Sequence, residues 1–209
     1  MPRPELLIDL MRHGEPVGGV RYRGHRDDPL SDAGWSQMRA AVDPADPWDG
    51  IVSSPLRRCR EFAETLSEQL DLALQIDAQF KEMAFGDWEG LLPDEVRTRF
   101  PDALRQYWRD PLRHTPPNAE PLAAFQRRIE TAGDGLIQQQ QQADTGHLLL
   151  VVHGGVIRVI LCRVLGIPVE RFMRIETPFA ARSRIRIRFN DAAEAWSSLV
   201  HHAFMPPAP

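Results

Sequence analysis

Two segments of this chain place a histidine and a glycine directly after a short apolar run. They are Arg12-His13-Gly14, which follows residues 6–11, and His153-Gly154-Gly155, which follows residues 148–152. Apolar runs of this length closed by glycine are typical of buried parallel strands. The carboxyl ends of parallel strands meet at one edge of a sheet, where α/β proteins bind ligands. We therefore expect the two imidazoles to converge at that edge.

An arginine beside a histidine is suited to an anion such as phosphate. Arg12 would bind the phosphate oxygens through paired hydrogen bonds, and a neutral ring nitrogen of His13 would be a nucleophile. The glycines at positions 14, 154 and 155 would let a phosphate approach backbone N–H groups without a Cβ atom in the way. A single histidine after a strand is more often structural, but the paired placement, with Arg58 expected nearby, favours a phosphate site.

Helices alternate with the strands that would carry these residues. A strand over residues 48–53 leads to the same edge, and Ser54-Pro55 predicts a helix start with serine at the N-cap and proline at the first helical position. Ser31 predicts another helix start. The remaining elements indicated by apolar spacing are helices at about 122–136 and 156–165 and strands at about 184–189 and 196–201. This alternation predicts an α/β fold, a three-layer αβα sandwich with a mostly parallel central sheet.

The length of the chain predicts a single domain over residues 1–209. Residues 80–121 lack clean periodicity and are rich in proline. We expect a lid-like insertion of short helices and loops there, over the active edge. In the strand near residues 184–189, arginines alternate with apolar residues, which predicts a solvated strand face rather than a stripe that binds anions.

Composition excludes several classes of function. The net charge of −4 provides no basic field for nucleic acid. No run approaches the ~20 apolar residues that cross a bilayer, and Asp9 interrupts the only apolar run near the start, so we expect a cytoplasmic protein with no membrane partner. Cys59 and Cys162 lie among apolar residues at helical spacing, which predicts buried free thiols. Since the other histidines show no ligand spacing, we expect neither a metal nor a cofactor.

Four segments, in order, resemble the histidine phosphatase superfamily, the phosphoglycerate mutase-like enzymes. They are Arg12-His13-Gly14-Glu15, Ser53-Ser54-Pro55-Leu56-Arg57-Arg58, Glu82-Met83-Ala84-Phe85-Gly86-Asp87-Trp88-Glu89-Gly90 and Val151-Val152-His153-Gly154-Gly155. The resemblance covers nearly the whole chain. It implies a phosphoglycerate mutase-like fold, a small phosphorylated metabolite as partner and no metal.

The resemblance also implies a role for each site residue. His13 attacks phosphorus and forms a phosphohistidine, while its other ring nitrogen donates to a carbonyl that fixes the tautomer. Glu82 is the general acid for the leaving group. The phosphate is bound by Arg12, Arg58, Gly154 and His153, the last expected to be protonated. Candidate substrate contacts are Arg23 and Gly24, and contact by His25 or Glu120 is left open.

The resemblance is compatible with several activities. Pro16 follows the Arg-His-Gly-Glu motif, and the middle segment is short, so hydrolysis is favoured over phosphoglycerate mutase activity. The segments Phe85-Gly86-Asp87-Trp88 and Tyr107-Trp108-Arg109-Asp110 look like those of α-ribazole phosphatases of cobalamin synthesis, although broad-specificity phosphatases share parts of this pattern. An inactive member that binds phosphorylated ligands is the alternative from another class. The natural substrate and the oligomeric state are not defined by the sequence.

Overall fold

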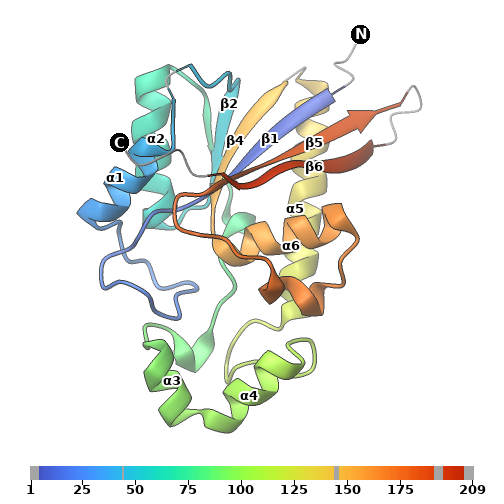
Figure 1. The fold of residues 1–209 in the computed structure, drawn as a ribbon. Helices are drawn as coiled ribbons and strands as arrows, with labels where there is room; N and C mark the ends of the chain where they lie inside the picture. The colour runs from blue at the N-terminus through green and yellow to red at the C-terminus, as the bar shows by residue number, and fades with distance from the viewer. Residues whose placement is uncertain (1–4, 44, 144–145, 191–194, 205–209) are drawn as a thin grey trace.

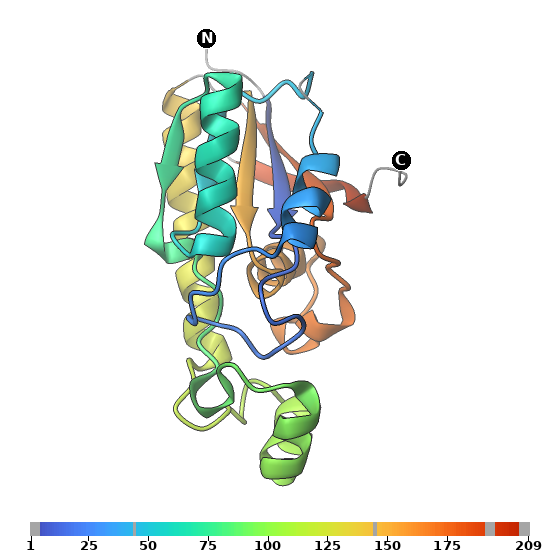
Figure 2. The ribbon, with the colours of Figure 1, turned by 90° about the vertical axis from the view of Figure 1, so that its left-hand side faces the viewer.

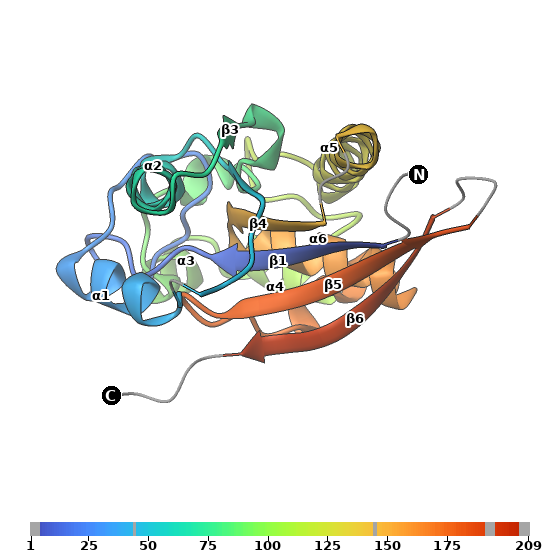
Figure 3. The same ribbon diagram turned by 90° about the horizontal axis from the view of Figure 1, so that it is seen from above.

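The computed structural model describes residues 5–43, 45–143, 146–190 and 195–204 (Figure 1). Within these ranges the strands form one six-stranded sheet in the order β3-β2-β4-β1-β5-β6. The strands are β1 (Glu5–Arg12), β2 (Gly50–Ser53), β3 (Leu74–Ile76), β4 (His147–Val152), β5 (Arg182–Phe189) and β6 (Ala195–Phe204). Strands β1 to β4 pair in parallel, and β5 and β6 add an antiparallel edge, visible in Figure 3. The short strand β3 was not predicted from the sequence.

Helices cover both faces of the sheet. They are α1 (Asp32–Ala40), α2 (Arg57–Leu70), α5 (Leu122–Gln142) and α6 (Gly154–Leu165), with the 3-10 helix η3 (Val169–Arg174) after α6. Side chains of β4 alternate between the two faces. Leu150 packs in the core with Phe125 of α5, whereas Val151 packs in the core with Phe62 of α2. The predicted α/β sandwich is confirmed: α1 and α2 form one layer (Figure 2), and α5 and α6 form the other.

The segment between β3 and α5 consists of short helices and loops. It contains η1 (Ala78–Phe80), η2 (Gly86–Trp88), α3 (Pro93–Arg99) and α4 (Pro101–Arg109). Proline begins both α3 and α4, as expected for a residue that lacks an N–H. Figures 1 and 2 show these two helices beyond the carboxyl ends of β1 and β4. Their action as a lid stays a prediction.

One predicted helix start is confirmed and one is wrong. Ser31 is the N-cap of α1, and its side chain accepts from the N–H of Gly34. The helix after β2 begins at Arg57 with Leu56 at the N-cap, two residues later than the Ser54-Pro55 pattern indicates. The Ser54 hydroxyl still accepts from a backbone N–H, that of Leu56 at 3.3 Å, in the turn before the helix, and it also lies 2.7 Å from the imidazole Nε2 of His153.

The arginine face of β5 is partly buried, so the prediction of a solvated face is wrong for its inner residues. Arg182 is only 9% exposed, and the Arg184 guanidinium bonds both carboxylate oxygens of Asp9, at 2.6 and 2.9 Å. Asp9 is fully buried on β1, and the indole N–H of Trp48 also donates to it at 2.8 Å. Burial raises the pKa of Asp9, but its contacts with Arg184, His147 and Trp48 together outweigh burial and hold the pKa well below its usual value.

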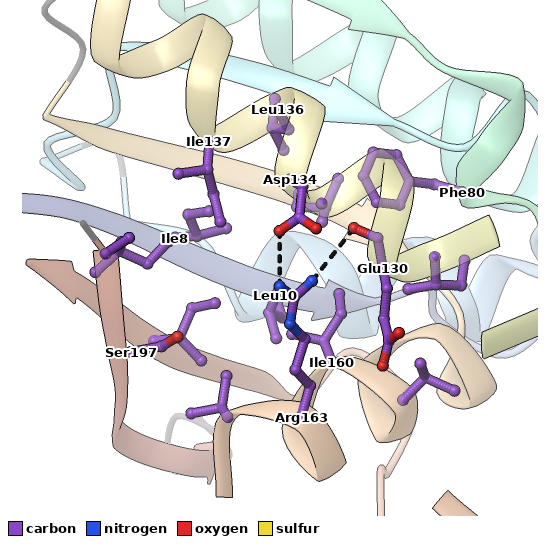
Figure 4. Close-up of a pocket in the computed structure, with 18 residues that line it drawn as sticks. Ile8, Leu10, Phe80, Glu130, Asp134, Leu136, Ile137, Ile160, Arg163 and Ser197 are labelled. Atoms are coloured by element: carbon purple, nitrogen blue, oxygen red, sulfur yellow. Dashed lines mark hydrogen bonds and ion pairs between the residues drawn. The ribbon is translucent and has the colours of Figure 1, made fainter. Parts of the chain in front are cut away.

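A largely aliphatic cavity of about 140 Å³ lies between α5, α6 and the sheet (Figure 4). Arg163 of α6 lies at this cavity and pairs with Asp134 of α5 at 2.8 Å. A Cβ atom added to Gly133, which also lines the cavity, would meet nothing within 4 Å. No histidine lines this space, so the candidate active site lies elsewhere.

Both cysteines, Cys59 and Cys162, are buried free thiols, as predicted. Across the described ranges, none of the helices is long and apolar enough to cross a membrane.

Candidate active site

The two histidines that were expected to converge lie next to each other at the carboxyl edge of the sheet. His13 follows β1 and His153 follows β4, and these strands pair in parallel with Arg12 opposite Val152. The ring centroids are 5.3 Å apart, at an interplanar angle of 62°. Both side chains are buried. The predicted convergence of the two imidazoles is confirmed.

His13 is held in the tautomer that a nucleophile requires. Its Nδ1 lies 2.7 Å from the carbonyl oxygen of Gly14, which can only accept, so Nδ1 carries the hydrogen and Nε2 keeps the lone pair. Burial lowers the pKa of His13 well below 6.5, and the positive charges of Arg58 and Arg12 lower it further. The ring is therefore neutral at pH 7.

His153 is also neutral when only protein surrounds it. Its Nε2 lies 2.7 Å from the Ser54 hydroxyl, and the Cys59 sulfur lies 3.7 Å from both ring nitrogens. Burial lowers the pKa of His153 well below 6.5, followed by the charge of Arg58. Burial therefore disfavours the cation in the protein alone, and protonation of His153 beside a bound phosphate stays a prediction. A phosphate dianion beside the ring would raise this pKa.

Two arginines flank the histidines and each keeps one donor unused. The Nε atoms of Arg12 and Arg58 are buried, and neither has a hydrogen-bond partner among the described residues. Their other donors fix the side chains: Arg58 bonds the carbonyl oxygens of Arg26 (2.7 Å) and Gly24 (2.8 Å), and Arg12 bonds that of Thr177 (2.5 Å). Because buried donors are nearly always satisfied in proteins, this pair indicates an anion site.

The site carries positive charge with little compensation. Burial lowers the pKa of Arg12 to about 10 and lowers that of Arg58 as well, yet both side chains stay charged at neutral pH. The carboxylate that opposes this effect at both arginines is that of Glu82. Two arginines against one carboxylate favour a dianionic ligand.

Glu82 reaches this site from the loop after η1. One carboxylate oxygen accepts from the backbone N–H of Met83 and the other from that of Gly155, both at 2.9 Å. The side chain is 8% exposed. A cavity of about 170 Å³ is lined by Glu82 together with Arg12 and His13. The structure thus brings together residues from three distant segments, and their chemical roles stay predictions.

Arg128 of α5 holds the backbone that carries Glu82. It forms a two-pronged ion pair with Glu120, at 2.7 and 3.0 Å. It also donates to the carbonyl oxygens of Lys81, at 3.0 Å, and of Gln79. Glu120 is therefore engaged in holding this segment, and it does not line the cavity beside His13.

The loop between β1 and α1 contributes Val20, Arg21, Tyr22 and Arg23 to the cavity. Arg23 lines it, with its guanidinium bonded to Asp28 at 2.7 Å. The Gly24 N–H donates to Glu89 at 3.1 Å, and a Cβ atom on Gly24 would lie 2.1 Å from the carbonyl oxygen of Met83. Close packing therefore explains the glycine, and contact of Arg23 or Gly24 with a substrate stays a prediction.

The glycines of the two motifs serve different purposes. A Cβ atom on Gly14 would lie 2.2 Å from the carbonyl oxygen of Gly34, so this glycine allows the loop after β1 to pack against α1. The prediction that Gly14 clears space for phosphate is therefore wrong. A Cβ atom on Gly155 would lie 2.2 Å from Glu82 Oε1, so this glycine makes room for the carboxylate. Gly154 begins α6, two residues before the predicted start, and lines the cavity, while its contact with phosphate stays a prediction.

Two further residues of the site were missed from the sequence. The Arg12 guanidinium lies over the ring of Phe179, 4.1 Å from its centroid, and that ring is 5.7 Å from His13. Phe179 comes from the irregular segment before β5, where no local pattern indicates a role. Arg158 of α6 lines the same cavity. It follows Gly154 by about one helical turn, a spacing that places both residues on one face of the helix.

An α/β sandwich with two facing histidines after neighbouring strands, flanked by Arg12 at the end of β1 and Arg58 in the first turn of α2, defines a class of phosphoryl-transfer enzymes. The sequence model of the histidine phosphatase superfamily (branch 1) matches residues 8–198, and the chain belongs to this superfamily. It is a phosphoric monoester hydrolase.

Several named relatives are similar to this chain over most of its length. A glucosyl-3-phosphoglycerate phosphatase from Mycolicibacterium vanbaalenii is 32% identical over 78% of this chain and 76% of its own length. An adenosylcobalamin/alpha-ribazole phosphatase from Salmonella typhimurium is 30% identical over 76% of this chain and 79% of its own. The crystal structure of the alpha-ribazole phosphatase from Shigella flexneri has a TM-score of 0.80 and 25% identity, covering 95% of this chain and 96% of that one. These relatives are named for different substrates.

Proposed function

We propose that this protein is a metal-independent phosphomonoesterase that works through a phosphohistidine on His13. The observation that carries the proposal is the bond from Nδ1 of His13 to the Gly14 carbonyl, beside two buried arginines with unused Nε donors. This arrangement provides a nucleophile with its lone pair on Nε2 and a cationic site for the phosphate.

In the first step, Nε2 of His13 attacks phosphorus and the bond from phosphorus to the ester oxygen breaks. Arg12 and Arg58 bind the phosphoryl oxygens through charge-assisted hydrogen bonds. His153, whose pKa rises beside the dianion, contributes a further donor to the developing charge. Glu82 gives its proton to the departing alkoxide, which leaves as the alcohol.

In the second step, water attacks the phosphohistidine. The Glu82 carboxylate takes a proton from the water, the bond from phosphorus to nitrogen breaks, and Nε2 of His13 regains its lone pair. Inorganic phosphate leaves, and Glu82 is protonated for the next turnover. The two arginines and His153 balance the phosphate charge throughout, so this reaction needs no metal.

For the natural substrate we propose α-ribazole 5′-phosphate. The support is the resemblance of the segments at residues 85–88 and 107–110 to α-ribazole phosphatases, together with the Salmonella relative at 30% identity. A broad range of sugar or metabolite phosphates is the nearest competing activity, because another relative is named for glucosyl-3-phosphoglycerate.

The test is hydrolysis of p-nitrophenyl phosphate without added metal, followed by a screen of phosphorylated metabolites with free phosphate measured. The screen includes α-ribazole 5′-phosphate, phosphoserine and 3-phosphoglycerate. We expect turnover in the first assay and the highest kcat/KM for α-ribazole 5′-phosphate. Binding without turnover would favour the inactive phospholigand-binding alternative, and transfer of phosphate between phosphoglycerate positions would favour a mutase.

A further inference from the structure

A second cavity, of about 130 Å³, adjoins the one that contains His13. It lies between the loop after η1, the helix α4 and the helix α6. Five residues line both cavities: Tyr22, Glu82, Phe85, Gly155 and Arg158. Neither His13 nor Arg12 lines the second one. The shared residues therefore form the passage from the phosphate site to the second cavity.

The position of Glu82 indicates which part of a substrate the second cavity would bind. A nucleophile and a leaving group lie on opposite sides of phosphorus in an in-line displacement. In the proposed reaction His13 attacks from the first cavity and Glu82 protonates the departing oxygen. Because Glu82 lies at the passage and His13 does not line the second cavity, the carbon body of the leaving alcohol extends into the second cavity.

The walls of the second cavity are mostly aromatic. Aromatic rings line it at Tyr22, Phe85, Tyr107, Trp108 and Phe172. The first two of these are in a T-shaped contact, with ring centroids 5.4 Å apart. Arg158 is the one cationic side chain on the wall, and its Nε donates to the carbonyl oxygen of Ile175 at 2.8 Å.

Such walls favour one kind of leaving group. Aromatic side chains bind flat rings through offset and edge-to-face contacts, and an arginine adds a cation over a ring face. The polar partners beside these rings are Glu82, Arg158 and the hydroxyl groups of Tyr22 and Tyr107, so a sugar acid or an amino acid with several hydroxyl, ammonium and carboxylate groups would lose more water than the wall replaces. A cavity of about 150 Å³ is known to hold one benzene ring, so this one has the size for a single ring.

On the basis of the proposed hydrolysis at His13, we infer that the preferred substrates are phosphomonoesters whose leaving alcohol carries an aromatic ring, bound against the wall that Tyr22, Phe85 and Trp108 form. Trp108, on α4, is the specificity-determining residue that can be tested most cleanly. It is 57% exposed, so its removal leaves the core of the protein intact. Only some of the substrates for which the relatives are named carry an aromatic ring, so a preference for such a ring would favour those substrates over the others.

The experiment compares 2-phenylethyl phosphate with n-propyl phosphate. Their leaving groups are both primary alkoxides, but only the first carries an aromatic ring. We expect kcat/KM to be roughly 10-fold or more higher for the phenylethyl ester, expressed mainly in KM. In Trp108→Ala this ratio falls at least threefold. The matched control is Trp196→Ala on β6, an equally exposed tryptophan (51%) that does not line either cavity, and it keeps both the ratio and the rates.

Two results would overturn the inference while the proposed function stands. One is equal kcat/KM for the two esters in the wild type, with p-nitrophenyl phosphate still hydrolysed. The other is a Trp108→Ala variant that loses activity toward both esters by the same factor. If p-nitrophenyl phosphate is not hydrolysed at all, the proposed function fails, and this inference fails with it.

Discussion

Replacement of Gly155 by alanine should displace the carboxylate of Glu82, the proposed general acid, without touching the proposed phosphate ligands Arg12 and Arg58. The new Cβ atom would lie 2.2 Å from Oε1 of Glu82 and 3.0 Å from its carboxyl carbon. Ordinary contacts of a Cβ atom begin at 3.4 Å, so the carboxylate must move by roughly 1 Å and lose its 2.9 Å bond to the Gly155 N–H. A misplacement of about 1 Å in a catalytic group costs on the order of 10²-fold in rate.

The assay is kcat/KM for a series of phosphomonoesters with leaving groups of different acidity. In Gly155→Ala we expect a loss of ~10²-fold for alkyl phosphates, which need a proton, and a much smaller loss for p-nitrophenyl phosphate, which does not. The control is Gly133→Ala on α5, where the added Cβ meets nothing within 4 Å. It should leave the rates unchanged and raise stability by up to about 1 kcal/mol. Equal losses for all leaving groups in Gly155→Ala would refute the reasoning.

Three further predictions concern the same site. Glu82→Gln should slow alkyl phosphates by ~10²-fold or more and p-nitrophenyl phosphate less, whereas His153→Ala should slow both alike; a uniform loss in Glu82→Gln removes this glutamate from the acid role. Hydrolysis should survive EDTA, because Arg12 and Arg58 balance the phosphate charge; loss with EDTA and recovery with zinc or manganese would contradict this. Burial holds the pKa values of His13 and His153 below 6.5, so below that pH the unfolded chain binds more protons than the native one. The free energy of unfolding should then fall by up to about 1.4 kcal/mol per pH unit for each histidine, checked by urea unfolding at pH 7, 6 and 5; a flat profile would contradict it.

The sequence predicted the parts of the fold that local patterns encode. Alternation of apolar runs with amphipathic helices was enough for the α/β sandwich, because the parallel strands β1, β2 and β4 are largely buried on both faces. The ends of β1 and β4 could be located because glycine follows each run. Strand β3 was missed since three partly exposed residues, 74–76, make no run of their own.

Side-chain partners that come from distant segments could not be predicted in the same way. Ser54 has the sequence context of a helix cap, but its hydroxyl is engaged by His153, which lies 99 residues away along the chain. Asp9 looked like an interruption of an apolar run, and only the fold shows that Arg184 neutralises it. The position of Phe179 under Arg12 likewise depends on the path of a loop without regular structure.

The electrostatics of the site also required the structure. A phosphate site suggests a charged His153 from the sequence, yet burial beside Arg58 makes the neutral ring more stable in the protein alone. For a histidine nucleophile, a neutral ring with a carbonyl oxygen bonded at Nδ1 was expected. The bond between Nδ1 of His13 and the carbonyl oxygen of Gly14 confirms that geometry.

The most direct test of the account is to trap the covalent intermediate. The enzyme is mixed with ³²P-labelled substrate, quenched in base within one turnover, digested and mapped by mass spectrometry. The account predicts an acid-labile, base-stable phosphoryl group on His13, absent from His13→Ala and still formed by Glu82→Gln with an aryl phosphate as substrate. Label that persists in His13→Ala, or turnover of the wild type with no phosphoprotein under these conditions, would contradict it.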